Sequence, residues 1–493
     1  MKYILALDQG TTSSRAILFD EHGKVAGKAH QEFRQIYPKP GWVEHDPKDI
    51  LGSQVGVIAQ ALVRAGAAID DVVAVGISNQ RETTLVWDAS TGRPVYNAIV
   101  WQCRRTADIC DKLRAEGLDK LIYQKTGLVI DAYFSATKIQ WILENVPGAR
   151  DMAQAGRLRF GTVDTYLAYV LSGGRIYATD YTNAARTMLF NIHTLKWDDD
   201  LLALFGIPRS MLPEVCPSGH VYGRTDAAYT GRRMDICALV GDQQASLFGH
   251  LCIKKGDIKN TYGTGCFLLM NTGGVAVDSK NGLITTLTAS VRGKPDYALE
   301  GSVFAGGAAV QWLRDELRVI SSAAESEKLA LSVPSSGGVY VVPAFTGLGA
   351  PYWDARARGT IVGITRGTSR EHIVRATLEG IAYQVADIAG AMSLDAGTAI
   401  AGLRVDGGAS ENNFLMSFQS DILNCSVIRP AVTETTALGA AYLAGLTCGM
   451  WSDIAELEHN ERTERIFLPS IDEEERQKLL SGWHSAVSAS RVK

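Results

Sequence analysis

The sequence predicts an α/β protein built from two large domains, and three observations support this prediction. The chain has 493 residues, which is more than one hydrophobic core usually serves. Short apolar runs typical of buried strands alternate along the chain with stretches that have helical spacing. A hairpin with a glycine and threonine turn begins the chain, and a similar hairpin occurs near its middle. We expect a first domain over residues 1–245 and a second over residues 246–493.

The composition excludes several classes of protein. Hydrophobic residues make up 46% and charged residues 21% of the chain, as is typical of globular proteins. A net charge of -4 does not fit a nucleic-acid binder. No apolar run is long enough to span a bilayer, and the start of the chain lacks the apolar core of a signal peptide. We therefore expect a cytoplasmic protein that binds no nucleic acid and is not inserted in a membrane. The eight cysteines and nine histidines show no ligand spacing, so we expect neither disulfides nor a transition metal.

The first hairpin is a candidate phosphate site. Apolar runs over residues 3–7 and 16–19 predict two strands, and Gly10, Thr11, Thr12 and Ser13 lie between them. Glycine can adopt the backbone angles of a tight turn, and hydroxyl and backbone N–H groups bind anions. Asp8, at the end of the first strand, could hold a hydrated Mg²⁺ against phosphate oxygens. By itself, the motif could equally be an ordinary surface turn.

Two further loops could bind a polyhydroxylated molecule. The apolar run over residues 72–78 predicts a strand buried on both faces, and Arg81 and Glu82 follow it closely. A guanidinium donates hydrogen bonds while a carboxylate accepts them from hydroxyl groups. An exposed ion pair on a loop is the alternative. Tyr133 lies outside the apolar spacing of the helix predicted over residues 135–143, so its side chain could face a ligand.

Asp242 is the candidate catalytic carboxylate. It follows the predicted strand over residues 236–240 and begins a predicted helix. Ligands of α/β proteins gather at the carboxyl ends of strands, so Asp8 and Asp242 could face each other across a cleft. An aspartate at this junction could instead cap the helix, and one residue could serve both purposes.

The second half of the chain could supply a nucleoside site. Its hairpin over residues 257–269 has Thr264 in the turn, and one such hairpin per domain with a nucleotide between them is the plan of actin-like ATPases. Small residues at 305–309 precede a predicted helix, where a flat ring could approach closely or the helix could equally pack tightly against its neighbours. The strand at 403–406 runs into a diglycine turn, after which Asn412 could offer its amide to a nucleoside. The chain has no P-loop and no G-x-G-x-x-G motif at these sites.

Two predicted helices in the second half of the chain have a structural role and carry no candidate site residue. Thr368 and Glu371 have the spacing of a capping box ahead of an amphipathic helix. The charged segment over residues 473–487 is predicted to be a surface helix.

The sequence resembles the FGGY carbohydrate kinases from Asp8 to about Phe467. One signature of that family is Tyr133-x-Ser135-x-x-Lys138-Ile139-x-Trp141-Ile142; the other is Gly359-x-Ile361-x-Gly363-Ile364 followed by His372-Ile373-x-x-Ala376-Thr377-Leu378-Glu379. Four stretches resemble the members that phosphorylate glycerol, namely residues 38–47, 79–84, 101–106 and 241–244.

This resemblance implies two actin-like ATPase (ribonuclease H-like) domains with an active-site cleft between them. It implies ATP-dependent phosphorylation of glycerol to sn-glycerol 3-phosphate in glycerol catabolism, with Mg²⁺, by a homo-oligomer (dimer or tetramer). The ATP phosphates would contact Thr11, Thr12, Ser13, Arg15 and Thr264, and the nucleoside would contact Gly307, Gln311, Gly408 and Asn412. Glycerol would be bound by Arg81, Glu82, Tyr133, Asp242 and Gln243, with Asp242 as general base. Mg²⁺ would be held by Asp8 and Asp242 through water.

Two alternatives stay open at this point. The chain could be a kinase of the same family that phosphorylates another small polyol or a ketose, or it could be an actin-like ATPase that is not a kinase. Residues 227–234 keep only part of the glycine-rich basic loop that binds fructose 1,6-bisphosphate in some family members. We therefore do not expect that regulation here.

Overall fold

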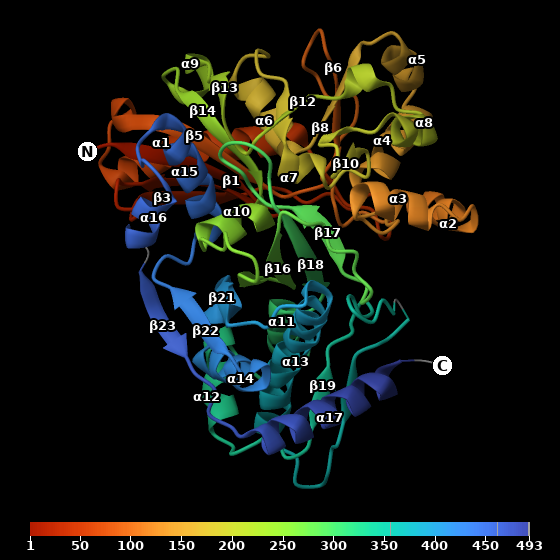
Figure 1. The fold of residues 1–493 in the computed structure, drawn as a ribbon, viewed down its shortest axis with the longest axis vertical. Helices are drawn as coiled ribbons and strands as arrows, with labels where there is room; N and C mark the ends of the chain where they lie inside the picture. The colour runs from red at the N-terminus through yellow and green to blue at the C-terminus, as the bar shows by residue number, and fades with distance from the viewer. Residues whose placement is uncertain (355, 461, 492–493) are drawn as a thin grey trace. The chain divides into compact units, whose positions relative to one another are not determined.

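The computed structural model describes residues 1–354, 356–460 and 462–491, which fold into two compact units (Figure 1). Unit 1 consists of Met1–Leu251, Thr285–Tyr297 and Thr435–Glu461, and unit 2 of Cys252–Ile284, Ala298–Glu434 and Arg462–Lys493. Each unit is built around a mixed sheet with helices packed against it. The predicted α/β fold is therefore confirmed, while the division at 245/246 stays a prediction.

The sheet of unit 1 has six strands in the order β13-β14-β5-β1-β2-β3. Their bounds are β1 Tyr3–Gln9, β2 Ser13–Phe19, β3 Val25–Glu32, β5 Val72–Asn79, β13 Gly219–Arg224 and β14 Asp235–Gly241. β1, β5 and β14 are parallel neighbours, and the other three strands are antiparallel to theirs. The carboxyl ends of the three parallel strands consequently meet at one edge of the sheet.

Helices cover both faces of this sheet. On one face, α1 (Pro47–Ala65) and α6 (Val163–Leu171) share a buried cluster with Leu5, Leu7 and Val75. Successive side chains of a strand point to opposite faces, so Gly76 faces the other side, where α15 (Thr435–Cys448) packs. A Cβ atom on Gly76 would lie only 2.3 Å from a backbone oxygen of α15. A late segment of the chain thus completes the core of unit 1.

Shorter elements of unit 1 surround the sheet. Its other helices are α2 Ala107–Ala115, α3 Asp119–Thr126, α4 Ser135–Asn145, α5 Ala149–Gln154, α7 Tyr181–Ala184, α8 Asp199–Phe205, α9 Ala227–Thr230, α10 Asp242–Gly249 and α16 Ile454–Asn460. Two-stranded pairs join β4 (Glu44–His45) to β7 (Ala98–Ile99), β6 (Leu85–Asp88) to β8 (Leu158–Gly161), β9 (Ala178–Asp180) to β12 (Glu214–Cys216) and β10 (Phe190–Asn191) to β11 (Lys196–Trp197).

The sheet of unit 2 includes β18-β16-β15-β21-β22-β23 in that order. Their bounds are β15 Ile258–Tyr262, β16 Cys266–Gly273, β18 Tyr297–Val303, β21 Gly402–Asp406, β22 Ser426–Pro430 and β23 Thr463–Phe467. β17 (Ile284–Leu287) begins where the chain passes from unit 2 to unit 1, and β19 (Tyr340–Val342) pairs with β20 (Thr360–Val362). The helices are α11 Gly307–Asp315, α12 Ala323–Leu331, α13 Arg370–Ala396, α14 Asn413–Leu423 and α17 Glu473–Ser490.

Two details of unit 2 differ from the predictions. The capping box of α13 is formed by Ser369 and His372 instead of Thr368 and Glu371. The hydroxyl of Thr368 is used elsewhere, because it accepts the N–H of Thr365 at 2.9 Å and closes the preceding turn. The C-terminal α17 is more than a surface helix, since its Trp483 is buried in the core of unit 2.

All eight cysteines are free, and seven of them are buried. In the described part of the chain, none of the helices combines the length and the apolar character needed to cross a membrane.

Candidate active site

The site in unit 1 is built on one row of residues across the sheet. Gln9 of β1 and Gly241 of β14 both pair with Asn79 of β5. The chain leaves the sheet at this row in three places, into the hairpin turn, into the loop that carries Arg81 and Glu82, and into α10. The sequence thus delivers its candidate residues to one edge, because each follows a buried parallel strand. Asp8 and Asp242 lie at this same edge with β5 between them; that they face each other across a cleft stays a prediction.

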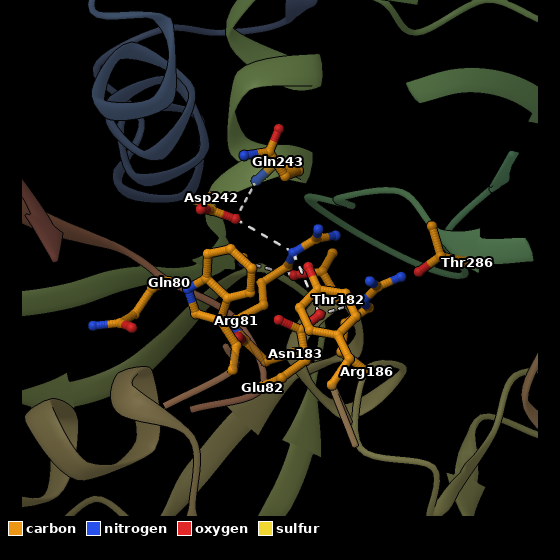
Figure 2. Close-up of polar contacts among 12 residues, drawn as sticks. Gln80, Arg81, Glu82, Thr182, Asn183, Arg186, Asp242, Gln243 and Thr286 are labelled. Carbon is orange, nitrogen blue, oxygen red and sulfur yellow. Dashed lines mark hydrogen bonds and ion pairs between the residues drawn. The ribbon is translucent and has the colours of Figure 1, made fainter. Parts of the chain in front are cut away.

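Arg81 and Asp242 form an ion pair at the centre of the site (Figure 2). The Nε atom of Arg81 lies 3.3 Å from Oδ1 of Asp242, and its Nη1 donates to Oε1 of Gln244 at 3.1 Å. The Arg81 side chain is buried, whereas that of Asp242 is 30% exposed. The guanidinium therefore fixes a carboxylate that can still reach a ligand.

Gly241 makes this approach of the guanidinium possible. A Cβ atom at this position would lie 2.8 Å from Cδ of Arg81. Gly241 is also the N-cap of α10, and Asp242 is the first residue of the helix, where its Oδ1 accepts the N–H of Gln243 at 2.7 Å. Asp242 is therefore not the N-cap residue, and the helix N-terminus favours its negative charge.

Glu82 is held in a strained backbone conformation. Its φ is 59°, which is uncommon for a residue with a Cβ atom and costs free energy. Three contacts keep it there: the Thr83 N–H donates to the Arg81 carbonyl at 2.6 Å, and the hydroxyls of Ser135 and Thr84 donate to the Glu82 carbonyl. Its buried Oε1 accepts from Nε of Arg186 at 2.6 Å. The strain orients this carboxylate, as is frequent at ligand sites.

Trp101 connects the first hairpin to Tyr133. Its indole Nε1 donates to Oγ1 of Thr11 at 2.9 Å, and its ring meets the Tyr133 ring edge to face with centroids 5.4 Å apart. The guanidinium of Arg186 lies 5.4 Å from the ring centroid of Tyr133 and 5.2 Å from that of Phe134. Lys138 donates to the carbonyl of Tyr133, and burial lowers the pKa of Lys138 to about 8. Trp101, Arg186 and Lys138 thus fix the position of Tyr133.

The hairpin turn is shorter than predicted. Gly10, Thr11 and Thr12 form it, with the Gly10 N–H donating to the Ser13 carbonyl at 3.0 Å. Ser13 and Arg15 belong to β2 instead. Arg15 pairs with Asp8 across the hairpin, and its Nη1 lies 3.7 Å from Oδ2 of Asp8. The turn can therefore offer threonine hydroxyls and an adjacent cation to a phosphate.

The carboxylates suit a hydrated Mg²⁺ better than a tightly ligated metal. Asp8 accepts from Oγ of Ser78 at 2.9 Å and lies near Arg15, while Asp242 pairs with Arg81. Mg²⁺ typically keeps several waters and is bound by one or two carboxylates together with substrate phosphates. Over the described residues there is no group of three or more His, Cys, Asp or Glu side chains placed to hold a metal ion. The two aspartates thus fit the predicted role through water.

Unit 2 presents a second glycine-rich edge. β15 and β21 are parallel neighbours, and they end in the turn around Thr264 and in Gly407 and Gly408, respectively. The start of α11 closes on the turn, because the N–H groups of Gly306 and Ala308 donate to the Thr264 carbonyl. A Cβ on Gly307 would meet the Gly263 carbonyl at 2.8 Å. The glycines here permit close backbone packing.

The polar candidates of unit 2 differ in how available they are. Gln311 on α11 is exposed, as is Thr264. Asn412 is the N-cap of α14: its Oδ1 accepts the Leu415 N–H at 2.9 Å, and its Nδ2 donates to Ser326 at 3.2 Å. Its amide therefore has a structural role besides the predicted contact with a nucleoside.

Sequence reasoning missed Arg186, Trp101 and Gln244 as parts of the site. Trp101 and Gln244 lie in stretches that the resemblance had singled out, but neither had been given a role. Arg186 was missed completely, although it is an arginine inside the mostly apolar run 184–190. A charge in such a run requires a buried partner, and this signal could have found it.

Comparison with known proteins adds independent information. The N-terminal domain of the FGGY family of carbohydrate kinases matches residues 3–249, and its C-terminal domain matches residues 258–448. The glycerol kinase of Symbiobacterium thermophilum is 62% identical over 489 residues, covering 99% of this chain and 98% of that protein. Glycerol kinase 2 of Thermotoga maritima is 61% identical over 490 residues, covering 99% of each. The crystal structure of Plasmodium falciparum glycerol kinase with ADP superposes with a TM-score of 0.94 at 36% identity, covering 100% of this chain and 99% of that one.

Proposed function

Because this chain belongs to the FGGY family of carbohydrate kinases, we propose that it transfers the terminal phosphate of ATP to glycerol, giving sn-glycerol 3-phosphate and ADP. The observation that carries the proposal is the similarity to proteins named glycerol kinase over 99% of the chain. The site in unit 1 supports it, since its charged groups are few, close together and held rigidly.

The substrate pocket is made by Arg81, Glu82, Tyr133, Asp242 and Gln243. A triol offers three donors and three acceptors on a short carbon chain. The two carboxylates accept from hydroxyl groups and the guanidinium donates to them, while the Tyr133 ring packs against carbon atoms. The short distances between Arg81 and both carboxylates, 3.3 Å to Asp242 and 3.8 Å to Glu82, favour a small polyol.

Asp242 is the general base. A primary alcohol is a weak nucleophile, so a carboxylate that takes its proton as the new P–O bond forms lowers the barrier. The bond from the γ-phosphorus to the bridging oxygen of ADP breaks at the same time, and ADP leaves with both electrons of that bond. Asp242 then releases its proton to water. Arg81 keeps the carboxylate oriented throughout, because it is buried and cannot turn away.

The ATP phosphates would be bound by Thr11, Thr12, Ser13, Arg15 and Thr264, and the nucleoside by Gly307, Gln311, Gly408 and Asn412. Asp8 and Asp242 would hold Mg²⁺ through water, and the ion would supply positive charge against the phosphates. We propose a cytoplasmic homo-oligomer that works in glycerol catabolism, and two domains divided near residue 245.

A substrate panel tests this function directly. ADP release is measured with Mg-ATP and glycerol, dihydroxyacetone, erythritol or xylulose, together with a blank that contains no polyol, and each product is identified by its mass. We expect glycerol to give the highest kcat/KM and the blank to be low. A preference for xylulose would retain the mechanism and overturn the substrate, whereas a strong blank that no polyol changes would indicate an ATPase that is not a kinase.

A further inference from the structure

A single helical turn behind the site contacts several of its parts. α7 (Tyr181–Ala184) follows β9, and three of its four residues are buried. Thr182 and Asn183 contact the strand ends, and Arg186, two residues after the helix, reaches Glu82 (Figure 2). None of these residues was predicted from the sequence to take part in the reaction. The proposed function above leaves their arrangement unexplained.

Asp180 anchors this turn. Its carboxylate is completely buried and accepts from the backbone N–H groups of Thr182 and Asn183, as the N-cap of α7. It also accepts from the Thr182 hydroxyl at 2.7 Å, from Nδ2 of Asn183 at 3.0 Å and from the Ser218 hydroxyl at 2.7 Å. Such a saturated buried network has one well-defined geometry.

From this anchor, two side chains reach the ends of two parallel strands. Asn183 and Asn79 exchange a pair of amide hydrogen bonds of 2.9 and 3.0 Å, which fixes the end of β5. Oγ1 of Thr182 accepts the N–H of Gly241 at 2.8 Å, which fixes the end of β14. The next residue after Gly241 is Asp242.

The Thr182 hydroxyl makes two hydrogen bonds, one to Asp180 as donor and one from Gly241 as acceptor. This hydroxyl has one proton, which it donates to Asp180, so the Gly241 N–H must be accepted by a lone pair on the same oxygen. Gly241 also packs closely against Arg81, because a Cβ atom on Gly241 would lie 2.8 Å from Cδ and 2.9 Å from Cγ of Arg81. Gly241, the residue before Asp242, is therefore held between Thr182 and Arg81.

We propose that Thr182 is a positioning residue that acts through Gly241 to orient the carboxylate of Asp242, with Asp180 as its buried anchor. This inference rests on the proposed role of Asp242 as the base. Thr182 makes no contact with substrate in this proposal, and its hydroxyl matters only through the strand end that it holds.

The test compares Thr182→Val, which keeps the shape and removes the hydroxyl, with Thr182→Ser, which keeps the hydroxyl. Thr165→Val is the matched control, because Thr165 is also a buried threonine and its Oγ1 has no hydrogen-bond partner among the described residues. kcat and KM are measured with whichever polyol the wild-type enzyme turns over fastest. A preference for a polyol other than glycerol would contradict the proposed substrate and leave this test intact.

We expect Thr182→Val to lower kcat by about 100-fold, the scale of a small misplacement of a catalytic group, with little change in the KM of the polyol. Thr182→Ser should recover most of the loss, and Thr165→Val should match the wild type. In an Asp242→Asn background the Thr182→Val change should have almost no further effect, because the two residues act in series. If Thr182→Val does not fold, Thr182→Cys takes its place, since a thiol is only a weak acceptor.

Three results would overturn the inference. One is a normal kcat in Thr182→Val, and another is an equal loss in the Ser and Val variants. The third is a full additional loss in the Asp242→Asn background, which would indicate a general structural effect. No turnover of any polyol by the wild type would contradict both this inference and the proposed function.

Discussion

Replacing Asp242 with asparagine isolates its role as a base from its role in the structure. Asparagine has the same size, and its Oδ1 can still accept the Gln243 N–H that Asp242 accepts at 2.7 Å. The side chain is 30% exposed and is therefore already in contact with solvent, so the substitution should have little effect on the fold. What is lost is the ability to take a proton and the charge that faces Arg81.

The size of the effect follows from these losses. Positioned general bases contribute about 10²- to 10⁴-fold in rate, which corresponds to about 2.7–5.4 kcal/mol of barrier. We expect kcat of Asp242→Asn to fall by that factor, while the Kd of ATP, measured by calorimetry, changes by less than about threefold.

Asp199→Asn is the control for this experiment. Its side chain is 83% exposed at the start of α8, where it pairs with Arg209, so its removal should leave kcat unchanged. A near-normal kcat in Asp242→Asn would refute the base assignment. Loss of ATP binding together with turnover would instead show that Asp242 chiefly supports the nucleotide site.

Three further predictions follow. Arg81→Ala should raise the KM of glycerol by about 10- to 100-fold, because charged hydrogen bonds of this kind contribute about 1.5–3 kcal/mol. Arg224→Ala on β13 is the control. An unchanged KM in Arg81→Ala would mean that glycerol binds at a different site. Gly439→Ala should lower the melting temperature by several degrees, since its Cβ would lie 1.8 Å from a backbone oxygen of α10 and overpacking costs about 1–3 kcal/mol. Gly390→Ala, in open space on α13, should not lower it, and equal melting temperatures would contradict the close packing. Burial raises the pKa of Asp164 from 3.8 to about 7, so the folded state holds a proton there that the unfolded chain has released. The stability that the protonated Asp164 contributes is complete below about pH 4 and is lost as the pH rises through 7. In Asp164→Asn the melting temperature should therefore change less with pH over this range. An unchanged slope of melting temperature against pH would contradict the raised pKa.

The sheet could be predicted from the sequence because its central strands are buried on both faces. β1, β5 and β14 appear as continuous apolar runs, and a candidate polar residue follows each of them. Parallel strands bring such residues together at their carboxyl ends. Asp8, Arg81 and Asp242 could be found for this reason, before any contact was known.

What could not be predicted depends on contacts between distant segments. Arg186 is 104 positions from Glu82 in sequence, and no local pattern relates the two. The positive φ of Glu82 is imposed by its surroundings, since glutamate has no intrinsic preference for it. The capping box of α13 was displaced by one residue because two adjacent hydroxyl residues, Thr368 and Ser369, could each have served as N-cap.

The position of α15 has a consequence for the order in which the protein is made. Unit 1 needs α15 to cover the face of its sheet that contains Gly76, yet α15 emerges from the ribosome long after Leu251. Translation adds about 5–20 residues per second, so the stretch between Leu251 and Thr435 takes roughly 10–40 s to synthesise. During this time the first sheet has an uncovered apolar face, and a nascent chain of this length is a natural client for chaperones. For the same reason, a fragment that stops at Leu251 should aggregate instead of folding as an independent domain.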